Sequence, residues 1–251
     1  MTQRRPALRL VAGVAILVLL GVGLHVMLQP DRVAGYVLRQ MGSTLGLEIS
    51  ASGGSSYRLR GGPSLLVRNV RVREPGATRP LLAANRVYVA VPWTTVRNRG
   101  EQLDITRIEL DSPMLDIDAL QHWLAARPSS GTTRIPTLAD GLSITDGSIV
   151  GDGWHVDGFA LSLPRLHEGQ PLDARSRGVA HVDGLDAHFN LAIAMTQPAV
   201  RAGVAVIGPI TVDGDDWTMK SRLRAGGSLD ATSDALHITR LRTSVSTFPL
   251  R

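Results

Sequence analysis

Apolar side chains follow two different spacings along the chain, and the spacing changes near residue 47. Before it, residues 10–28 form a nearly unbroken apolar run, and apolar side chains in residues 30–46 recur every three or four positions, as on one helix face. Beyond it, apolar and polar residues alternate, as in strands with one buried and one wet face. The pattern predicts an all-β protein with N-terminal helices.

The apolar run Leu10–Leu28 has the length of a membrane span. Its 19 residues include one polar side chain, His25, near the end. At a rise of 1.5 Å per residue, the run covers roughly 28 Å, close to the thickness of a bilayer core. Arg4, Arg5 and Arg9 precede it and favour a cytoplasmic N-terminus. We expect residues 1–29 to be a transmembrane anchor; the alternative is a signal peptide cleaved near Gly21–Gly23.

Residues 30–46 predict a second, amphipathic helix. Apolar residues recur at helical spacing from Val33 to Leu45, Asp31 lies in the first turn, and Gly46 is suited to end the helix. Such a helix either lies on the membrane surface or covers the edge of a sheet.

Residues 47–251 predict an elongated, curved antiparallel sheet behind the single transmembrane helix. Alternation is clearest around Val87 and from Leu185 to Ile193, and one wet face favours antiparallel pairing. Asp-Gly pairs, which suit hairpin turns, occur at 140–141, 146–147, 152–153, 157–158, 183–184 and 213–214. The clearest hairpin joins 178–182 to 185–194 through Asp183-Gly184.

One helix interrupts the sheet. Residues 118–127 begin with Asp118, the expected N-cap, and place Leu120, Trp123 and Leu124 on one face. With the loop that follows, they divide a first sheet section, 47–117, from a second, 134–251. The two sections are expected to form one continuous body.

Composition argues against most enzyme chemistry. The chain has no cysteine, which excludes disulfides, thiol nucleophiles and zinc–thiolate sites. The net charge of +5 includes the three arginines before the anchor, so no strong basic patch points to nucleic acid. Neither a phosphate-binding loop nor a nucleophile elbow occurs. We therefore expect no catalytic residues, no metal and no cofactor.

The histidines and acidic clusters are expected to be solvated. None of the seven histidines has the spacing that places two metal ligands on one helix face. His181 and His188 flank a turn, as solvent-facing strand residues or as diagonal neighbours on one face. Residues 213–216, Asp-Gly-Asp-Asp, predict a hairpin turn and not a calcium loop. Arg68, Arg71 and Arg73 predict the wet face of a strand.

Four segments, in order behind an apolar run, resemble the N-terminal region of the AsmA-like family of bacterial envelope proteins. They are Gly46–Ser50, Arg60–Val72, Leu82–Val91 and Leu103–Ile117. The last is similar to the family's L-x-I-x-x-I-x-L-x-x-P-x-L-x-I pattern. The resemblance covers the first 130 residues, and the chain is far shorter than the large family members.

The resemblance implies a single-pass inner-membrane protein with a periplasmic body and an apolar groove that shields lipid acyl chains in transit to the outer membrane. Membrane lipids and other envelope proteins would be its partners, and nucleic acid would not. The groove candidates are the inward apolar residues Val70, Val72, Val87, Val89, Val91, Phe189, Leu191 and Ile193. If a second layer covers them, they form an ordinary core.

A second hypothesis is an accessory structural subunit of a secretion machine, similar to the N-type protein of type II secretion. Such a protein has a similar size, one anchor and a β-rich periplasmic body. Its apolar face would be closed by a second layer or by a partner protein.

Overall fold

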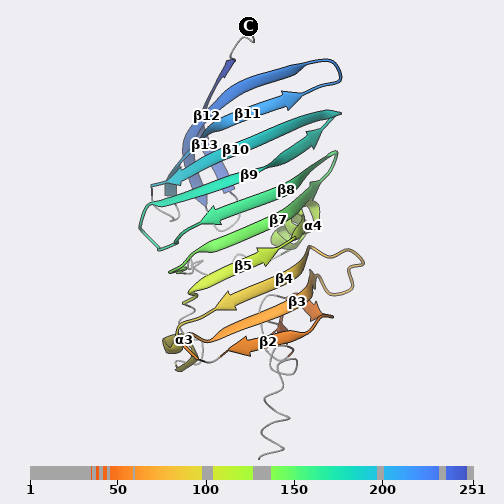
Figure 1. The fold of residues 1–251 in the computed structure, drawn as a ribbon, viewed down its shortest axis with the longest axis vertical. Helices are drawn as coiled ribbons and strands as arrows, with labels where there is room; N and C mark the ends of the chain where they lie inside the picture. The colour runs from red at the N-terminus through yellow and green to blue at the C-terminus, as the bar shows by residue number, and fades with distance from the viewer. Residues whose placement is uncertain are drawn as a thin grey trace, which may run out of the picture.

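A computed structural model describes residues 35, 38–39, 42–43, 46–58, 60–97, 104–126, 137–196, 201–231 and 236–247. In these residues a single sheet of 13 strands dominates, and the strands stack along the long axis of the molecule (Figure 1). The first strands are β1 (Glu48–Ala51), β2 (Ser55–Arg58), β3 (Ser64–Arg73), β4 (Leu82–Ala90), β5 (Arg107–Asp111) and β6 (Met114–Asp116). The remainder are β7 (Leu142–Gly151), β8 (Trp154–Leu163), β9 (Leu172–Val182), β10 (Leu185–Met195), β11 (Arg201–Asp213), β12 (Thr218–Ala231) and β13 (Leu236–Thr247). The all-β prediction is confirmed.

From β7 onward the sheet is a simple meander in which each strand pairs with its neighbours in sequence. The expected β9–β10 hairpin is confirmed and is longer than predicted, because Leu172–Val182 pairs along its full length with Leu185–Met195. Asp183 and Gly184 at its turn have φ of 50° and 77°. These two positive angles are what a two-residue hairpin turn requires and what Asp-Gly tolerates.

The prediction of a purely antiparallel sheet is wrong at one junction. Both β5 and β6 pair with β7 in parallel. The helix α4 (Ile117–Ala125) carries the chain across between β6 and β7, and a parallel pair requires such a crossover. The sequence signalled the helix, but the pairing on either side of it depends on contacts distant in sequence.

The N-cap of α4 is Asp116, not Asp118 as the sequence suggested. The Asp116 side chain accepts a hydrogen bond from the Ala119 amide at 2.9 Å, and Asp118 lies in the first turn. Leu120 and Trp123 pack against the sheet as expected, whereas Leu124 is 54% exposed. A short helix that the sequence did not predict, α3 (Trp93–Arg97), follows β4.

The buried core lies at the N-terminal end of the sheet. It is formed by Leu47, Val67, Val70, Val72 and Leu81, with Leu120 and Trp123 of α4 packed against it. On the opposite face, Arg68, Arg71 and Arg73 are exposed, as predicted. The helix α4 therefore covers the inner face of the first strands.

The predicted N-terminal segments are only partly described. The apolar run 10–28 and the loop 128–133 lie outside the described residues. Within the predicted helix 30–46, Gly35, Leu38, Arg39, Gly42 and Ser43 are helical. No helix in the described part of the chain is long and apolar enough to cross a membrane.

The Asp-Gly pairs have two different roles. Those at 152–153, 183–184 and 213–214 lie at hairpin turns, and that at 140–141 precedes β7. The pairs at 146–147 and 157–158 were predicted to be turns, and this prediction is wrong. They lie inside β7 and β8, at positions where the register shifts. Asp146 and Gly158 have φ of 53° and 57°, so these pairs form bulges that bend the strands.

Candidate functional site

The candidate site is the inner face of the sheet, which is the face that carries the core cluster at its N-terminal end. The registers show which side chains share this face beyond the core. One row runs from Leu161 through Ser176 and Leu191, and another from Ala174 through Ile193 and Val206. Directly paired residues lie on the same face of a sheet. The inner face is therefore continuous across the strands.

Apolar side chains predominate on this face from β8 to β12. They are Leu161 of β8, Phe189, Leu191 and Ile193 of β10, Val204, Val206, Ile210 and Val212 of β11, and Leu223 of β12. All of them are half-buried. Among the described residues no large side chain is fully buried. Side chains packed between two layers would be buried on every side. Because these side chains are only half-buried, we infer that the inner face from β8 to β12 is partly open.

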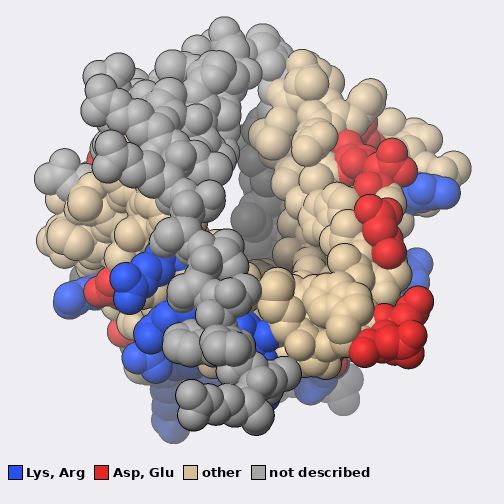
Figure 2. Space-filling model, turned by 90° about the horizontal axis from the view of Figure 1, so that it is seen from above, with Lys and Arg blue, Asp and Glu red and all other residues tan. Residues whose placement is uncertain are grey.

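The sheet curves around a hollow. Viewed along the long axis, the described residues form walls on two sides of a central depression (Figure 2). Most of the acidic residues visible in this view lie on the outer side of the right-hand wall, away from the depression, and a few lie at the left edge of the molecule. The part of the right-hand wall that faces the depression carries side chains other than Lys, Arg, Asp and Glu.

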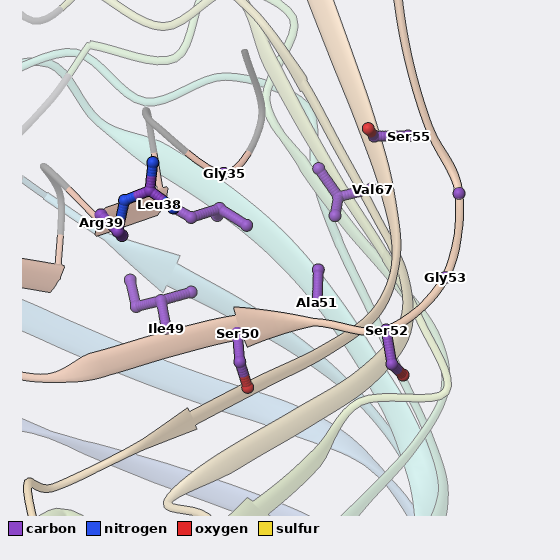
Figure 3. A pocket seen from close by; sticks show the side chains of 11 residues that line it. Gly35, Leu38, Arg39, Ile49, Ser50, Ala51, Ser52, Gly53, Ser55 and Val67 are labelled. Atoms are coloured by element: carbon purple, nitrogen blue, oxygen red, sulfur yellow. The ribbon is translucent and has the colours of Figure 1, made fainter. Parts of the chain in front are cut away.

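One hollow lies at the N-terminal end of the inner face. Its volume is about 620 Å³, and Leu38, Ile49, Ala51 and Val67 point into it (Figure 3). Its rim is formed by small residues between β1 and β2, including Gly53 and Gly54. The volume falls in the range of roughly 300–1,000 Å³ that is common for ligand pockets.

A second hollow of about 400 Å³ lies at the ends of β9 to β12. Leu172, Met195 and Val204 line it, together with Gly203 and Gly227. Met195 pairs directly with both Leu172 and Val204, so these three side chains share the inner face. The two hollows therefore lie in different parts of the inner face, and the lining of the first also includes the charged side chain of Arg39.

The eight groove candidates fall into two groups. Val70 and Val72 are 6% and 8% exposed, and Val87 packs against them in the core. These three side chains lie in the covered core, and none of them lines either hollow. Val89 is half-buried beside Leu65 and Ile108, and Val91 lies just past β4.

Phe189, Leu191 and Ile193 form the other group, on the partly open part of the face. Sequence reasoning missed the inner residues of β11, although Val204, Val206, Ile210 and Val212 lie at even spacing. Gly208-Pro209 interrupts this alternation, but Val206 and Ile210 on its two sides are four positions apart and therefore share one face of the strand. The half-open surface is consequently wider than predicted.

The outer face carries polar pairs. Arg86 of β4 binds Asp111 and Glu109 of β5 at 2.6 Å and 2.7 Å. The hydrogen bond to Asp111 is the main cause that raises the pKa of Arg86 above its ordinary value; burial opposes this effect and Glu109 adds to it. As predicted, His181 and His188 lie on this face, each with its own carboxylate partner, Asp186 and Asp213 respectively.

Comparison of the chain with models of known protein families, with curated proteins and with solved structures gives no match.

Proposed function

We propose that this chain is a non-catalytic envelope protein, held in the bacterial inner membrane by residues 10–28, whose periplasmic sheet shields lipid acyl chains along its inner face. The observation that carries the proposal is the half-buried apolar surface from Leu161 to Leu223, which continues across five strands. The N-terminal segments that resemble AsmA-like proteins support the same assignment.

The chemistry of such a surface suits hydrocarbon. A methylene group transferred from water to an apolar surface gains about 0.8 kcal/mol. Phe189, Leu191 and Ile193 offer contact of this kind at successive inward positions of one strand. Contiguous apolar patches of more than a few hundred Å² are uncommon on soluble monomers and usually mark a binding surface.

Site-specific photo-crosslinking tests the proposal, because neighbouring residues of β10 face opposite ways. A photoreactive phenylalanine replaces Leu191 or Ile193 on the inner face, and the matched controls replace Ala192 or Ala194, which are exposed on the outer face. Irradiation of living cells is followed by mass spectrometry of the adducts. We expect lipid adducts at 191 and 193 and few at 192 and 194.

Two outcomes would contradict acyl-chain shielding. Equal lipid labelling of Leu191 and Ala192 would indicate nonspecific contact with the membrane. Protein adducts without lipid at Leu191 would favour the alternative, an accessory subunit of a secretion machine whose apolar face is covered by a partner.

The absence of cysteine from the sequence allows the topology to be tested separately. A single cysteine at Asp152, in the exposed β7–β8 turn, should react with a membrane-impermeant maleimide once the outer membrane is permeabilised. A cysteine at Thr2, before the apolar run, should react only after the inner membrane is broken. Protection of both positions in intact spheroplasts would overturn the periplasmic placement.

A further inference from the structure

A row of polar residues crosses the outer face near the hairpin tips, opposite the proposed groove. His155 of β8 pairs directly with His181 of β9, which pairs with Asp186 of β10. Asp157 lies two residues after His155 on the same strand and therefore on the same face. The register thus brings two imidazoles and two carboxylates together from three strands.

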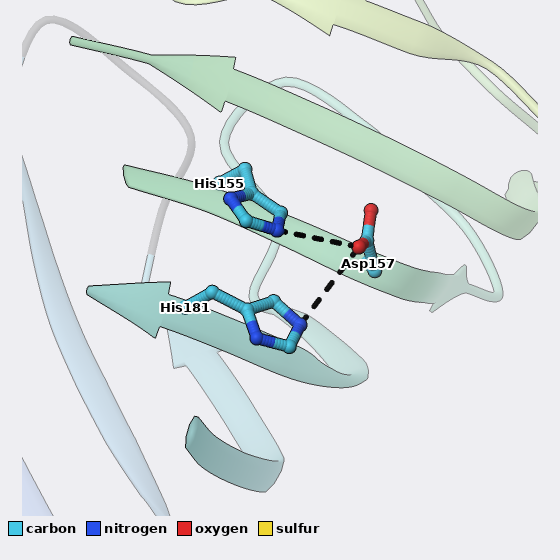
Figure 4. A group of neighbouring side chains, drawn as sticks. All are labelled: His155, Asp157 and His181. Carbon is cyan, nitrogen blue, oxygen red and sulfur yellow. Dashed lines mark ion pairs between the residues drawn. The ribbon is translucent and has the colours of Figure 1, made fainter. Parts of the chain in front are cut away.

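Three of these side chains converge on one point. Asp157 Oδ2 lies 3.5 Å from His155 Nε2 and 3.8 Å from His181 Nε2 (Figure 4). The two imidazole rings are stacked, with centroids 4.5 Å apart and an angle of 16° between their planes. One potential ligand atom from each of the three residues lies within 4.8 Å of the other two.

The spacing is close to that of a metal coordination shell. Ligand atoms about 2.0–2.1 Å from a tetrahedral zinc ion are roughly 3.4 Å from one another. The distances of 3.5 Å and 3.8 Å to Asp157 exceed this value by about 0.1 Å and 0.4 Å. All three ligand atoms lie within 4.8 Å of one another, so rotation of the side chains is needed to bring them to one ion. The site lies on strands and not on a mobile loop, so its backbone geometry is fixed by the register.

Asp186 fixes the orientation of His181. Its Oδ1 lies 2.7 Å from His181 Nδ1. When a neutral imidazole donates a hydrogen bond from its Nδ1–H group to a carboxylate, its Nε2 lone pair is left to bind a metal, and metal-binding histidines commonly have such a partner. His181 Nε2 is the atom that faces Asp157. The supporting carboxylate is therefore on the correct side of the ring.

We propose that His155 Nε2, His181 Nε2 and Asp157 Oδ2 form a binding site for a divalent transition metal of the zinc class, with Asp186 as the positioning residue for His181. Two imidazoles favour zinc, cobalt, nickel or copper over magnesium or calcium, which prefer oxygen ligands. The two carboxylates balance the charge of the ion. Water completes the coordination, because His155 and Asp157 are exposed.

Metal titration of the full-length chain in detergent tests this assignment. The protein is purified without a polyhistidine tag, treated with chelator, and titrated with Co²⁺ by visible absorption and with Zn²⁺ by calorimetry. We expect one ion per chain. Substitutions His155→Ala, His181→Ala and Asp157→Asn should each weaken binding at least tenfold, and Asp186→Asn should weaken it roughly 10- to 100-fold.

His188→Ala is the matched control, because His188 lies on the same face and contacts a different carboxylate, that of Asp213. This variant should bind the ion as the unaltered chain does. Far-UV circular dichroism should be unchanged in every variant. The proposal is overturned if the unaltered chain shows no saturable binding, or if His188→Ala weakens binding as much as His181→Ala. Because the site is on the outer face, either result leaves the acyl-chain proposal standing.

Discussion

Val67 and Val70 lie three positions apart on β3, and yet both are buried in the same core cluster. In a regular strand, residues three apart face opposite sides. Asn69 between them has a φ of 52°, and Arg68 and Asn69 are both exposed, so the strand gains one outward residue at this point. On β4 the register places Ala84 beside Val70 and Val87 beside Val67, so the partner strand makes the same adjustment.

The bend at Asn69 should tolerate glycine and resist a β-branched residue. A positive φ costs a side chain other than glycine about 1–2 kcal/mol, and asparagine is among the residues that tolerate it best. We expect Asn69→Val to lower the free energy of unfolding by about this amount and Asn69→Gly to change it little. Asn85→Val is the control, because Asn85 lies opposite and does not have a positive φ. Denaturant titration measures all three; equal losses at 69 and 85 would contradict the backbone explanation.

Glycine at position 208 should be required by the close approach of the neighbouring strand. A methyl group there would collide with the carbonyl oxygen of Asn190, whereas at Gly226 the nearest atom, the Val204 carbonyl oxygen, lies 3.8 Å away. Crowding of this kind costs about 1–3 kcal/mol. Gly208→Ala should therefore destabilise the protein by that amount and Gly226→Ala far less, as measured by thermal unfolding. The opposite order would refute this account.

Removal of the α4 cap should destabilise the crossover. Asp116→Ala leaves the Ala119 amide without its acceptor and is expected to cost about 1 kcal/mol. Asp118→Ala removes only a first-turn charge and should cost less. Urea unfolding distinguishes the two, and a larger loss for Asp118→Ala would restore Asp118 as the cap.

Arg86 should contribute to stability through both carboxylates of β5. Arg86→Leu removes two partly buried ion pairs and is expected to cost about 1 kcal/mol, with a smaller difference at high salt. Because the pKa of Arg86 is raised, its charge is fully present at neutral pH and would be lost only above its ordinary value. Salt titration is thus the informative measurement. Arg71→Leu, at an exposed outer position, is the control and should have little effect.

The parts of the fold that depend on local sequence could be predicted. The β9–β10 hairpin follows from Asp183-Gly184 between two alternating segments, and α4 follows from the spacing of Leu120 and Trp123. The bulges could not be predicted, because Asp146-Gly147 and Asp157-Gly158 have the same composition as a turn. An Asp-Gly pair forms a turn where the chain reverses after it and a bulge where the strand continues. Which of the two occurs depends on pairing with residues distant in sequence.

Among the possible site residues, Leu191 and Ile193 were predicted to lie on the inner face, because the alternation of apolar and polar residues alone determines which side of the sheet they occupy. His155 and His181 could not be paired from sequence, because their contact requires the β8–β9 register, which is set across the connection at 164–171. The sequence pattern that could have indicated the site is His155-x-Asp157 in one alternating segment, followed by His181 near the end of the next. A search restricted to helical ligand spacing overlooks it.

Since the described strands from β8 to β13 each pair only with strands adjacent in sequence, this meander resembles a repeat protein in its construction. Addition or removal of one whole hairpin would lengthen or shorten the inner face of the sheet and leave its curvature unaltered. The length of the sheet can therefore change in steps of two strands, while the end that α4 covers stays the same.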